Sequence, residues 1–179
     1  MEVSTGIAPA ASSEPQLARD DVPAQIAPGP WIAFSALVLG FAFDAFHAFR
    51  VLVHVPMWIR SVAALLLFAL ASWHIFRAVV VFRRSGTPFE PWRPTRIIAA
   101  QDIYARTRNP VVQGFLIGAL GIAVLFGSDG SMLMLMPAAM LMHYGVVLRE
   151  ESYLERRFGE AYRQYLAAVP RYGWPFPKP

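Results

Sequence analysis

The chain of 179 residues is 56% hydrophobic and only 16% charged, a balance typical of a membrane protein. It contains no cysteine, which excludes disulfides, thiolate metal sites and a cysteine nucleophile, and its four histidines form no paired metal-ligand motif. The net charge of +4 comes from arginines that flank apolar runs, so membrane topology explains it better than nucleic acid binding, and we expect neither a nucleic acid partner nor a metal.

The first 29 residues precede every apolar run and are rich in Ala, Pro and Ser. They contain no apolar stretch long enough to serve as a signal peptide. We therefore expect residues 1–29 to form a flexible tail that stays in the mature protein, and residues 30–179 to form a single domain.

An apolar run predicts a first transmembrane helix over about residues 31–53. Near its end Asp44, His47 and Arg50 recur at a spacing of three, which places them on one helical face. Two interpretations remain open. The polar face either marks the exit to the headgroups, with Arg50 reaching toward them, or directs Asp44 and His47 into a polar cavity among the helices.

A second apolar run predicts a transmembrane helix over about residues 57–82. The connection from Arg83 to Pro110 then carries six arginines against Glu90 and Asp102. Loops that face the cytoplasm carry an excess of lysine and arginine, so we expect this loop on the cytoplasmic side. We accordingly expect a multi-pass protein of a prokaryotic inner membrane.

Two shorter apolar runs follow, at about residues 111–127 and 131–148, joined by the turn GSDGS. Each has just the length needed to cross a bilayer, so the pair predicts a helical hairpin whose turn faces the non-cytoplasmic side. Gly114, Gly118 and Gly121 lie on one side of its first helix and predict close approach of a neighbouring helix. The predicted fold class is all-α, with about four transmembrane helices.

From Arg149 the chain becomes amphipathic, with one face marked at three- and four-residue spacing. The residues of this face are Glu151, Leu154, Phe158, Tyr162 and Tyr165. The predicted helix either folds back under the hairpin and closes a site at the cytoplasmic side or lies among the lipid headgroups. Glu150 and Glu151 favour the first interpretation, because anionic lipid repels carboxylates directly after a span unless cationic groups receive them.

A hairpin returns its two ends to the same face of the membrane, so Arg108 before it and the two glutamates after it are expected to lie close together. A guanidinium suits a carboxylate and a carboxylate suits an ammonium, which together match a zwitterionic amino-acid group. Asn109 and Pro110 leave free N–H groups at the start of the helix, which also suit a carboxylate. The alternative is that Arg108 only pairs with a glutamate and pins the hairpin.

The polar segments contain short motifs in a fixed order: Gly86-Thr87-Pro88, Pro94-Thr95-Arg96, Tyr104, Arg108-Asn109-Pro110, Gly114 and the ending REESYLERRFGEAYRQYLAAVPRY. This set resembles the isoprenylcysteine carboxyl methyltransferase family and its phospholipid methyltransferase relatives. The likeness covers about residues 83–172, roughly the C-terminal half of the chain. Each motif alone is weak, but the set around a hairpin of the right length is specific.

The resemblance implies an integral membrane methyltransferase that binds S-adenosylmethionine in a pocket facing the cytoplasm. In the family, the motif R-[HN]-P-x-Y-x-G and the E-E pair line this pocket. The cofactor-binding residues that the resemblance implies here are Tyr104, Arg108, Asn109, Pro110, Gly114, Glu150 and Glu151. Arg171, after the amphipathic helix, either closes over the cofactor or binds a lipid phosphate.

Methyl transfer from a sulfonium needs no covalent nucleophile, so the protein must mainly position the acceptor and exclude water. A carboxylate or thiolate acceptor needs only a cationic or hydrogen-bonding neighbour, whereas an amine or hydroxyl needs a base. The candidate catalytic residues are Glu150, Glu151 and His143, the last lying seven residues before Glu150 on roughly the same helical face. The alternative for His143 is a histidine bonded within the helix packing.

The chain departs from the family pattern at three positions. Val112 stands where the family has an aromatic ring, Arg106 replaces an aromatic residue, and Asp102 replaces a glycine. The loss of the ring removes a packing contact for the cofactor, and the other two changes alter the charge of the entrance. Either the acceptor is unusual or cofactor binding is weaker.

A site beneath a short hairpin, without a large soluble domain, is best reached laterally between helices, so we expect the lipid bilayer and a lipophilic or lipid-linked acceptor as partners. The acceptor group is a carboxylate, a thiol or an amine. Two other functions stay open: a membrane reductase that uses NADPH within a similar helical architecture, and a non-catalytic membrane protein that retains the fold. The oligomeric state is not predicted.

Overall fold

The computed structural model describes residues 26–47, 50–85 and 98–173. The predicted tail up to residue 25 and the motifs at residues 86–88 and 94–96 lie outside the described residues. The described residues are helical, without a strand among them, as α1 (Gly29–Phe46), η2 (Leu52–His54), α2 (Met57–Arg84), η3 (Asp102–Ala105), α3 (Pro110–Phe126), α4 (Asp129–Met142), η4 (His143–Val147), α5 (Leu148–Phe158) and α6 (Glu160–Ala168).

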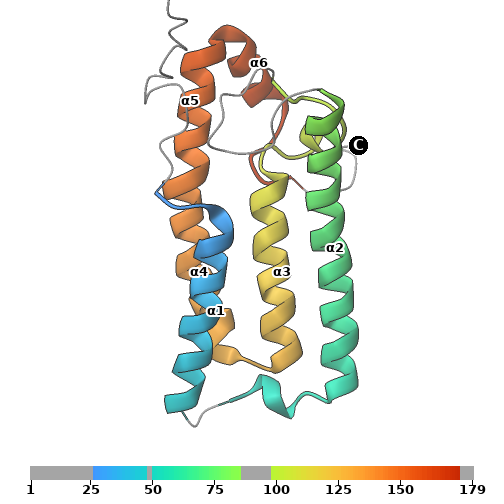
Figure 1. Cartoon of the computed structure of the whole chain (residues 1–179), viewed down its shortest axis with the longest axis vertical. Helices are drawn as coiled ribbons and strands as arrows, with labels where there is room; N and C mark the ends of the chain where they lie inside the picture. The colour runs from blue at the N-terminus through green and yellow to red at the C-terminus, as the bar shows by residue number, and fades with distance from the viewer. Residues whose placement is uncertain (1–25, 48–49, 86–97, 174–179) are drawn as a thin grey trace, which may run out of the picture.

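The long helices run side by side (Figure 1). α2 packs along α3 and α1 along α4, while α3 also contacts both α1 and α4. The start of α1, the end of α2, the start of α3 and the α5–α6 segment lie at the upper end in Figure 1, and η2 and the α3–α4 turn lie at the lower end. We call these the upper and lower ends.

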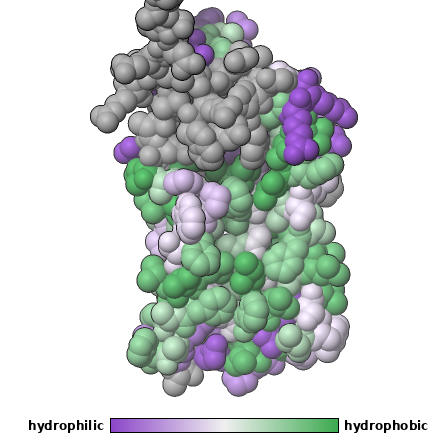
Figure 2. Space-filling model, viewed as in Figure 1, coloured by the Kyte–Doolittle hydropathy of each residue, from purple (hydrophilic) through white to green (hydrophobic). Residues whose placement is uncertain are grey.

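The chain is an integral membrane protein of the predicted all-α class. Among the described residues, three helices are long and apolar enough to cross a membrane: Gly29–Phe46, Met57–Arg84 and Asp129–Phe158. α3 is equally apolar but has only 17 residues. Apolar residues cover much of the body of the helices in Figure 2, as expected for a surface that faces lipid. The predicted count of four spans stays a prediction.

α3 and α4 follow one another through a short turn and contact each other. Pro110 occupies the first turn of α3, where its missing N–H costs nothing. α3 ends at Gly127, whose φ of 65° is the left-handed value typical of a helix C-cap. Ser128 then caps α4, because its hydroxyl accepts a hydrogen bond from the Ser131 amide at 3.0 Å. The turn motif thus ends one helix and starts the next.

The glycines of α3 let α2 approach closely. A Cβ on Gly114 would lie 2.6 Å from Ile75 Cγ1, and one on Gly121 would lie 2.8 Å from Phe68 Cε1. Both contacts are too short for a side chain, so a larger residue would push the two helices apart. The prediction of a close helix–helix contact is confirmed for Gly114 and Gly121, whereas a Cβ on Gly118 would meet Ala71 at an ordinary 3.6 Å.

The first helix is shorter than predicted. α1 ends at Phe46, and His47 has an extended backbone, with φ of −116° and ψ of 127°. Asp44, His47 and Arg50 therefore do not share a helical face, and that part of the prediction is wrong. The exposed His47 ring bonds back to the Phe43 carbonyl at 3.1 Å and stacks on the Phe43 ring.

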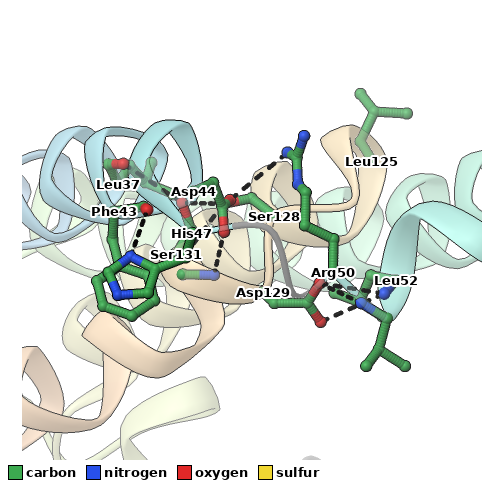
Figure 3. Close-up of polar contacts among 12 residues, drawn as sticks. Leu37, Phe43, Asp44, His47, Arg50, Leu52, Leu125, Ser128, Asp129 and Ser131 are labelled. Atoms are coloured by element: carbon green, nitrogen blue, oxygen red, sulfur yellow. Dashed lines mark hydrogen bonds and ion pairs between the residues drawn. The ribbon is translucent and has the colours of Figure 1, made fainter.

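Asp44 is buried at the lower end, where it holds the start of α4 (Figure 3). Its carboxylate accepts hydrogen bonds from the Ser128 hydroxyl at 2.5 Å and the Gly130 amide at 2.8 Å. Arg50 approaches the same carboxylate at 3.8 Å. Asp44 thus forms a structural latch between α1 and the α3–α4 turn, and the two interpretations of the polar face stay predictions.

The sequence pattern predicts one amphipathic helix after Arg149, but the segment forms two helices, α5 and α6. α4 continues without a loop through a π-helical turn, η4, into α5. The chain then breaks at Gly159, whose φ of 57° and ψ of −128° suit glycine alone. α6 folds back from this break toward η3 and the start of α3 (Figure 1). The prediction that this segment folds back is confirmed for α6 only.

Candidate functional site

The start of α3 leaves its positive end without a side-chain cap. Asn109, at the N-cap position, makes no capping hydrogen bond to the helix. Its side-chain nitrogen Nδ2 instead donates to the Arg171 carbonyl at 3.3 Å. The first N–H groups of a helix and its dipole favour an anion at such a position.

A cluster of three charged side chains lies beside this helix start. Arg108 Nη1 is 3.3 Å from Glu151 Oε1. Arg171 binds the same carboxylate with two prongs, its Nε at 3.0 Å from Oε1 and its Nη2 at 2.7 Å from Oε2. The predicted proximity of Arg108 and Glu151 is therefore present, and Arg171 joins them.

Arg108 is nearly buried yet incompletely satisfied. Its side chain is 10% exposed, and its Nε is a buried donor without a hydrogen-bond partner among the described residues. A buried donor without a partner costs roughly 1–3 kcal/mol, more when it belongs to a charged group. The donor set of Arg108 is thus built for one more acceptor than the described residues supply.

Glu150 and Glu151 differ although they are adjacent. Glu151 is buried and binds both arginines, whereas Glu150 takes part in none of the ion pairs between described residues. Its charge is felt nearby, because burial and then Glu150 raise the pKa of the Tyr104 phenol. One glutamate is engaged and the other is available.

The segment from Val169 to Gly173, here called the C-terminal strap, is bonded across the start of α3. The Arg108 amide donates to the Pro170 carbonyl at 3.1 Å. Gln113 Nε2 donates to the Gly173 carbonyl at 3.1 Å, and its Oε1 accepts a short hydrogen bond from Thr107. These bonds hold the strap so that Arg171 meets Glu151.

Three tyrosines surround the charged cluster. Tyr104 and Tyr162 are buried, and the Tyr165 hydroxyl donates to the Tyr104 carbonyl at 2.8 Å. The rings of Tyr162 and Tyr165 lie with their centroids 5.8 Å apart. Burial, followed by Glu151 and Glu150, raises the pKa of Tyr162, so its hydroxyl stays protonated at neutral pH. The arrangement places aromatic rings next to carboxylates, a combination that suits a cation.

His143 lies at the start of η4, where its Nδ1 is 2.8 Å from the Tyr172 hydroxyl. It contacts the strap, and no hydrogen bond or ion pair between described residues joins it to Arg108 or the glutamates. The π-helical turn adds a residue between His143 and Glu150, so equal spacing on a regular helix does not apply.

Gly114 and Val112 lie in helix packing and not in the charged cluster. Gly114 contacts α2 through Ile75 and Ala71. Val112, where the family has an aromatic ring, is buried in the core with residues of α1 and α4. The sequence does not predict Thr107, Gln113, Tyr162 or Tyr165 at the site. Tyr162 and Tyr165 carry one signal, which is their place on the predicted amphipathic face.

No group of three or more His, Cys, Asp or Glu side chains suited to a metal ion occurs in the described ranges. The ion pairs at this end are between side chains of opposite sign. The charged cluster and its surroundings consist of arginine, glutamate and tyrosine side chains.

Comparisons with known proteins identify the family of the chain. Residues 59–161 match the family model of the phospholipid methyltransferases. The chain is also 35% identical over 74 residues to the protein-S-isoprenylcysteine O-methyltransferase of Schizosaccharomyces pombe, a match that covers 41% of this chain and 31% of that protein. No solved structure matches the chain. Because the family model spans more than half of it, the chain belongs to the phospholipid methyltransferase family.

Proposed function

We propose that the protein is an S-adenosylmethionine-dependent methyltransferase that acts on a lipophilic or lipid-linked acceptor. The family assignment supports a membrane methyltransferase. The observation that carries the choice of cofactor is the buried Arg108, whose Nε has no partner beside the start of α3. A carboxylate placed there would accept from the guanidinium and meet the positive end of the helix.

The residues of the cluster fit the three charged groups of this cofactor. Arg108 and the start of α3 suit its carboxylate. Glu150, which takes part in no ion pair between described residues, suits its ammonium. The rings of Tyr162 and Tyr165 suit a cation near them. Glu151, already bound by Arg108 and Arg171, is assigned to holding the two arginines in place.

When bound, the cofactor supplies a methyl group on a sulfonium. The protein residues then have two tasks: to align the acceptor with that methyl group and to exclude water. The C-terminal strap and α6 cover the start of α3 and serve the second task. For a protic acceptor such as an amine, His143 is the candidate base, because Glu150 is assigned to the cofactor ammonium.

The bilayer is the proposed source of the acceptor. α2 is exposed along much of its length, with Trp58, Leu65 and Leu66 each about two-thirds or more exposed, so lipid and lipid-like molecules reach the helices directly. The relative from Schizosaccharomyces pombe is a protein-S-isoprenylcysteine O-methyltransferase. We infer an acceptor with an apolar tail for this chain also.

The upper end is proposed to face the cytoplasm. Arg83 and Arg84 end α2 there, and Arg156 and Arg157 lie in the last turn of α5. Arginines concentrate at the cytoplasmic end of membrane helices. This orientation places the cofactor site where a soluble cofactor has access.

The test is calorimetric binding of S-adenosylmethionine and S-adenosylhomocysteine to the full chain in lipid nanodiscs, with NADPH as a comparison ligand. Arg108→Ala is expected to weaken both adenosyl ligands about 10- to 100-fold, the value of one charged hydrogen bond. Arg156→Ala, which removes an exposed arginine of α5, is the matched control and should bind normally. Binding of NADPH in place of the adenosyl ligands would instead indicate the reductase.

A further inference from the structure

One turn next to the site has an unusual backbone. Asp102 has a φ of 60°, and it is the one non-glycine residue with a positive φ in the described ranges. An L-residue in this left-handed region costs on the order of 1 kcal/mol, and Asp bears the cost better than most residues. Such a turn persists when its surroundings hold it.

Arg77 of α2 holds this turn from the side. Its Nη2 lies 2.6 Å from both carboxylate oxygens of Asp102, and its Nε lies 2.9 Å from Oδ1. The Asp102 side chain is 22% exposed and that of Arg77 is 44% exposed. A two-pronged pair of this kind fixes both distance and direction.

The turn is followed directly by η3, which carries the site residue Tyr104. Asp102 starts η3, whose Ile103 and Tyr104 are buried against Ala78 and Val81 of α2. The Tyr104 carbonyl receives the Tyr165 hydroxyl and so holds α6. The position of η3 therefore sets where Tyr104 and α6 stand relative to the charged cluster.

The same turn also fixes the segment that carries Arg108. The amides of Arg106 and Thr107 both donate to the Ile103 carbonyl, at 3.0 and 3.1 Å. Thr107 then accepts from the Asn109 amide at 3.3 Å. A continuous chain of hydrogen bonds thus runs from the Asp102 turn to the start of α3.

We propose that Arg77 and Asp102 form a positioning pair, because together they hold the left-handed turn and so fix the position of η3. Through η3 they fix Tyr104, the contact of Tyr104 with α6, and the segment that carries Arg108. This inference rests on the proposed cofactor site. Neither residue touches the cofactor, and both act through η3. The charge that Asp102 brings to the entrance is neutralised by Arg77, so its role is geometric.

The experiment compares four forms of the full chain in nanodiscs: wild type, Arg77→Gln, Arg77→Lys and the control Arg83→Gln, which changes an exposed arginine at the end of the same helix. Two quantities are measured. The first is amide hydrogen exchange of residues 102–108 without cofactor, and the second is the Kd for S-adenosylmethionine.

Arg77→Gln is expected to speed exchange in residues 102–108 and to raise the Kd about three- to tenfold. Arg77→Lys, which keeps one charged contact, should recover much of both changes, and Arg83→Gln should match wild type. The effect of Arg77→Gln on the Kd should also be less than multiplicative with that of Tyr165→Phe, because both act through Tyr104.

Normal exchange of residues 102–108 in Arg77→Gln would overturn the positioning role, and so would a Lys variant no better than the Gln variant. If wild type fails to bind S-adenosylmethionine, the proposed function is wrong. In that case the exchange measurement still decides whether the pair fixes η3.

Discussion

Arg171 of the C-terminal strap forms a bidentate pair with Glu151 of α5, in which Nε lies 3.0 Å from Oε1 and Nη2 lies 2.7 Å from Oε2. The hydrogen bond to Glu151 raises the pKa of Arg171, so the guanidinium of Arg171 stays charged at neutral pH. Because Glu151 also holds Arg108 at 3.3 Å, one carboxylate connects the strap, α5 and the segment before α3. The site is thereby assembled from three parts of the chain that are distant in sequence.

Glu151→Gln should therefore weaken the attachment of the C-terminal strap more than the packing of the helices. Loss of the charge leaves two arginines facing each other without their common partner, at a cost of about 3 kcal/mol in the free energy of unfolding. We expect faster amide exchange in residues 169–173 and weaker binding of every adenosyl ligand. Unchanged exchange of the strap would show that its backbone hydrogen bonds suffice to hold it.

Glu150→Gln should behave differently, because Glu150 is proposed to receive the cofactor ammonium. It is expected to weaken S-adenosylmethionine and S-adenosylhomocysteine equally, by about tenfold. Binding of 5′-methylthioadenosine, which lacks the amino-acid group, should be unaffected, as should exchange in the strap. Equal losses for all three ligands would contradict the assignment of Glu150 to the ammonium.

Local sequence rules account for the hairpin. Pro110 at the first turn, Gly127 at the end and Ser128 as the next cap follow directly from known helix signals. The meeting of Arg108 with Glu151 follows from the same topology, since a hairpin returns both ends to one side. These features were predictable because each depends on neighbouring residues or on chain direction alone.

The features that could not be predicted depend on tertiary contacts. Nothing local indicates that α4 passes through a π-helical turn into α5, or that α1 ends at Phe46 so that Asp44 can reach the α3–α4 turn. The partners of Gln113 in the strap likewise lie about 60 positions away. Sequence periodicity predicts faces of helices but not which distant backbone group each polar side chain meets.

Gly173→Ala should displace the strap. A Cβ at this position would lie 1.7 Å from the Arg106 carbonyl oxygen, and backbone atoms cannot yield as a flexible side chain can. We expect loss of the bond from Gln113 to the strap and a rise in the Kd for S-adenosylmethionine of about tenfold or more. Gly118→Ala is the control, because its Cβ would meet Ala71 at an ordinary 3.6 Å. Normal binding by Gly173→Ala would mean that the strap does not shape the site.

Asp44→Ala should destabilise the protein without altering the site. The change leaves the buried Gly130 amide without its acceptor, whereas the Ser128 hydroxyl keeps the Ser131 hydroxyl at 2.6 Å, at a cost of roughly 1–3 kcal/mol. The midpoint of thermal unfolding in nanodiscs should fall, while cofactor affinity measured well below that midpoint should match wild type, because the latch lies at the lower end (Figures 1 and 3). Asp129→Ala offers a comparison, since Asp129 accepts from the Val51 and Leu52 amides at the more exposed η2, where water can replace it and the loss should be smaller. A weaker affinity in Asp44→Ala at full folding would show that the two ends of the bundle are coupled.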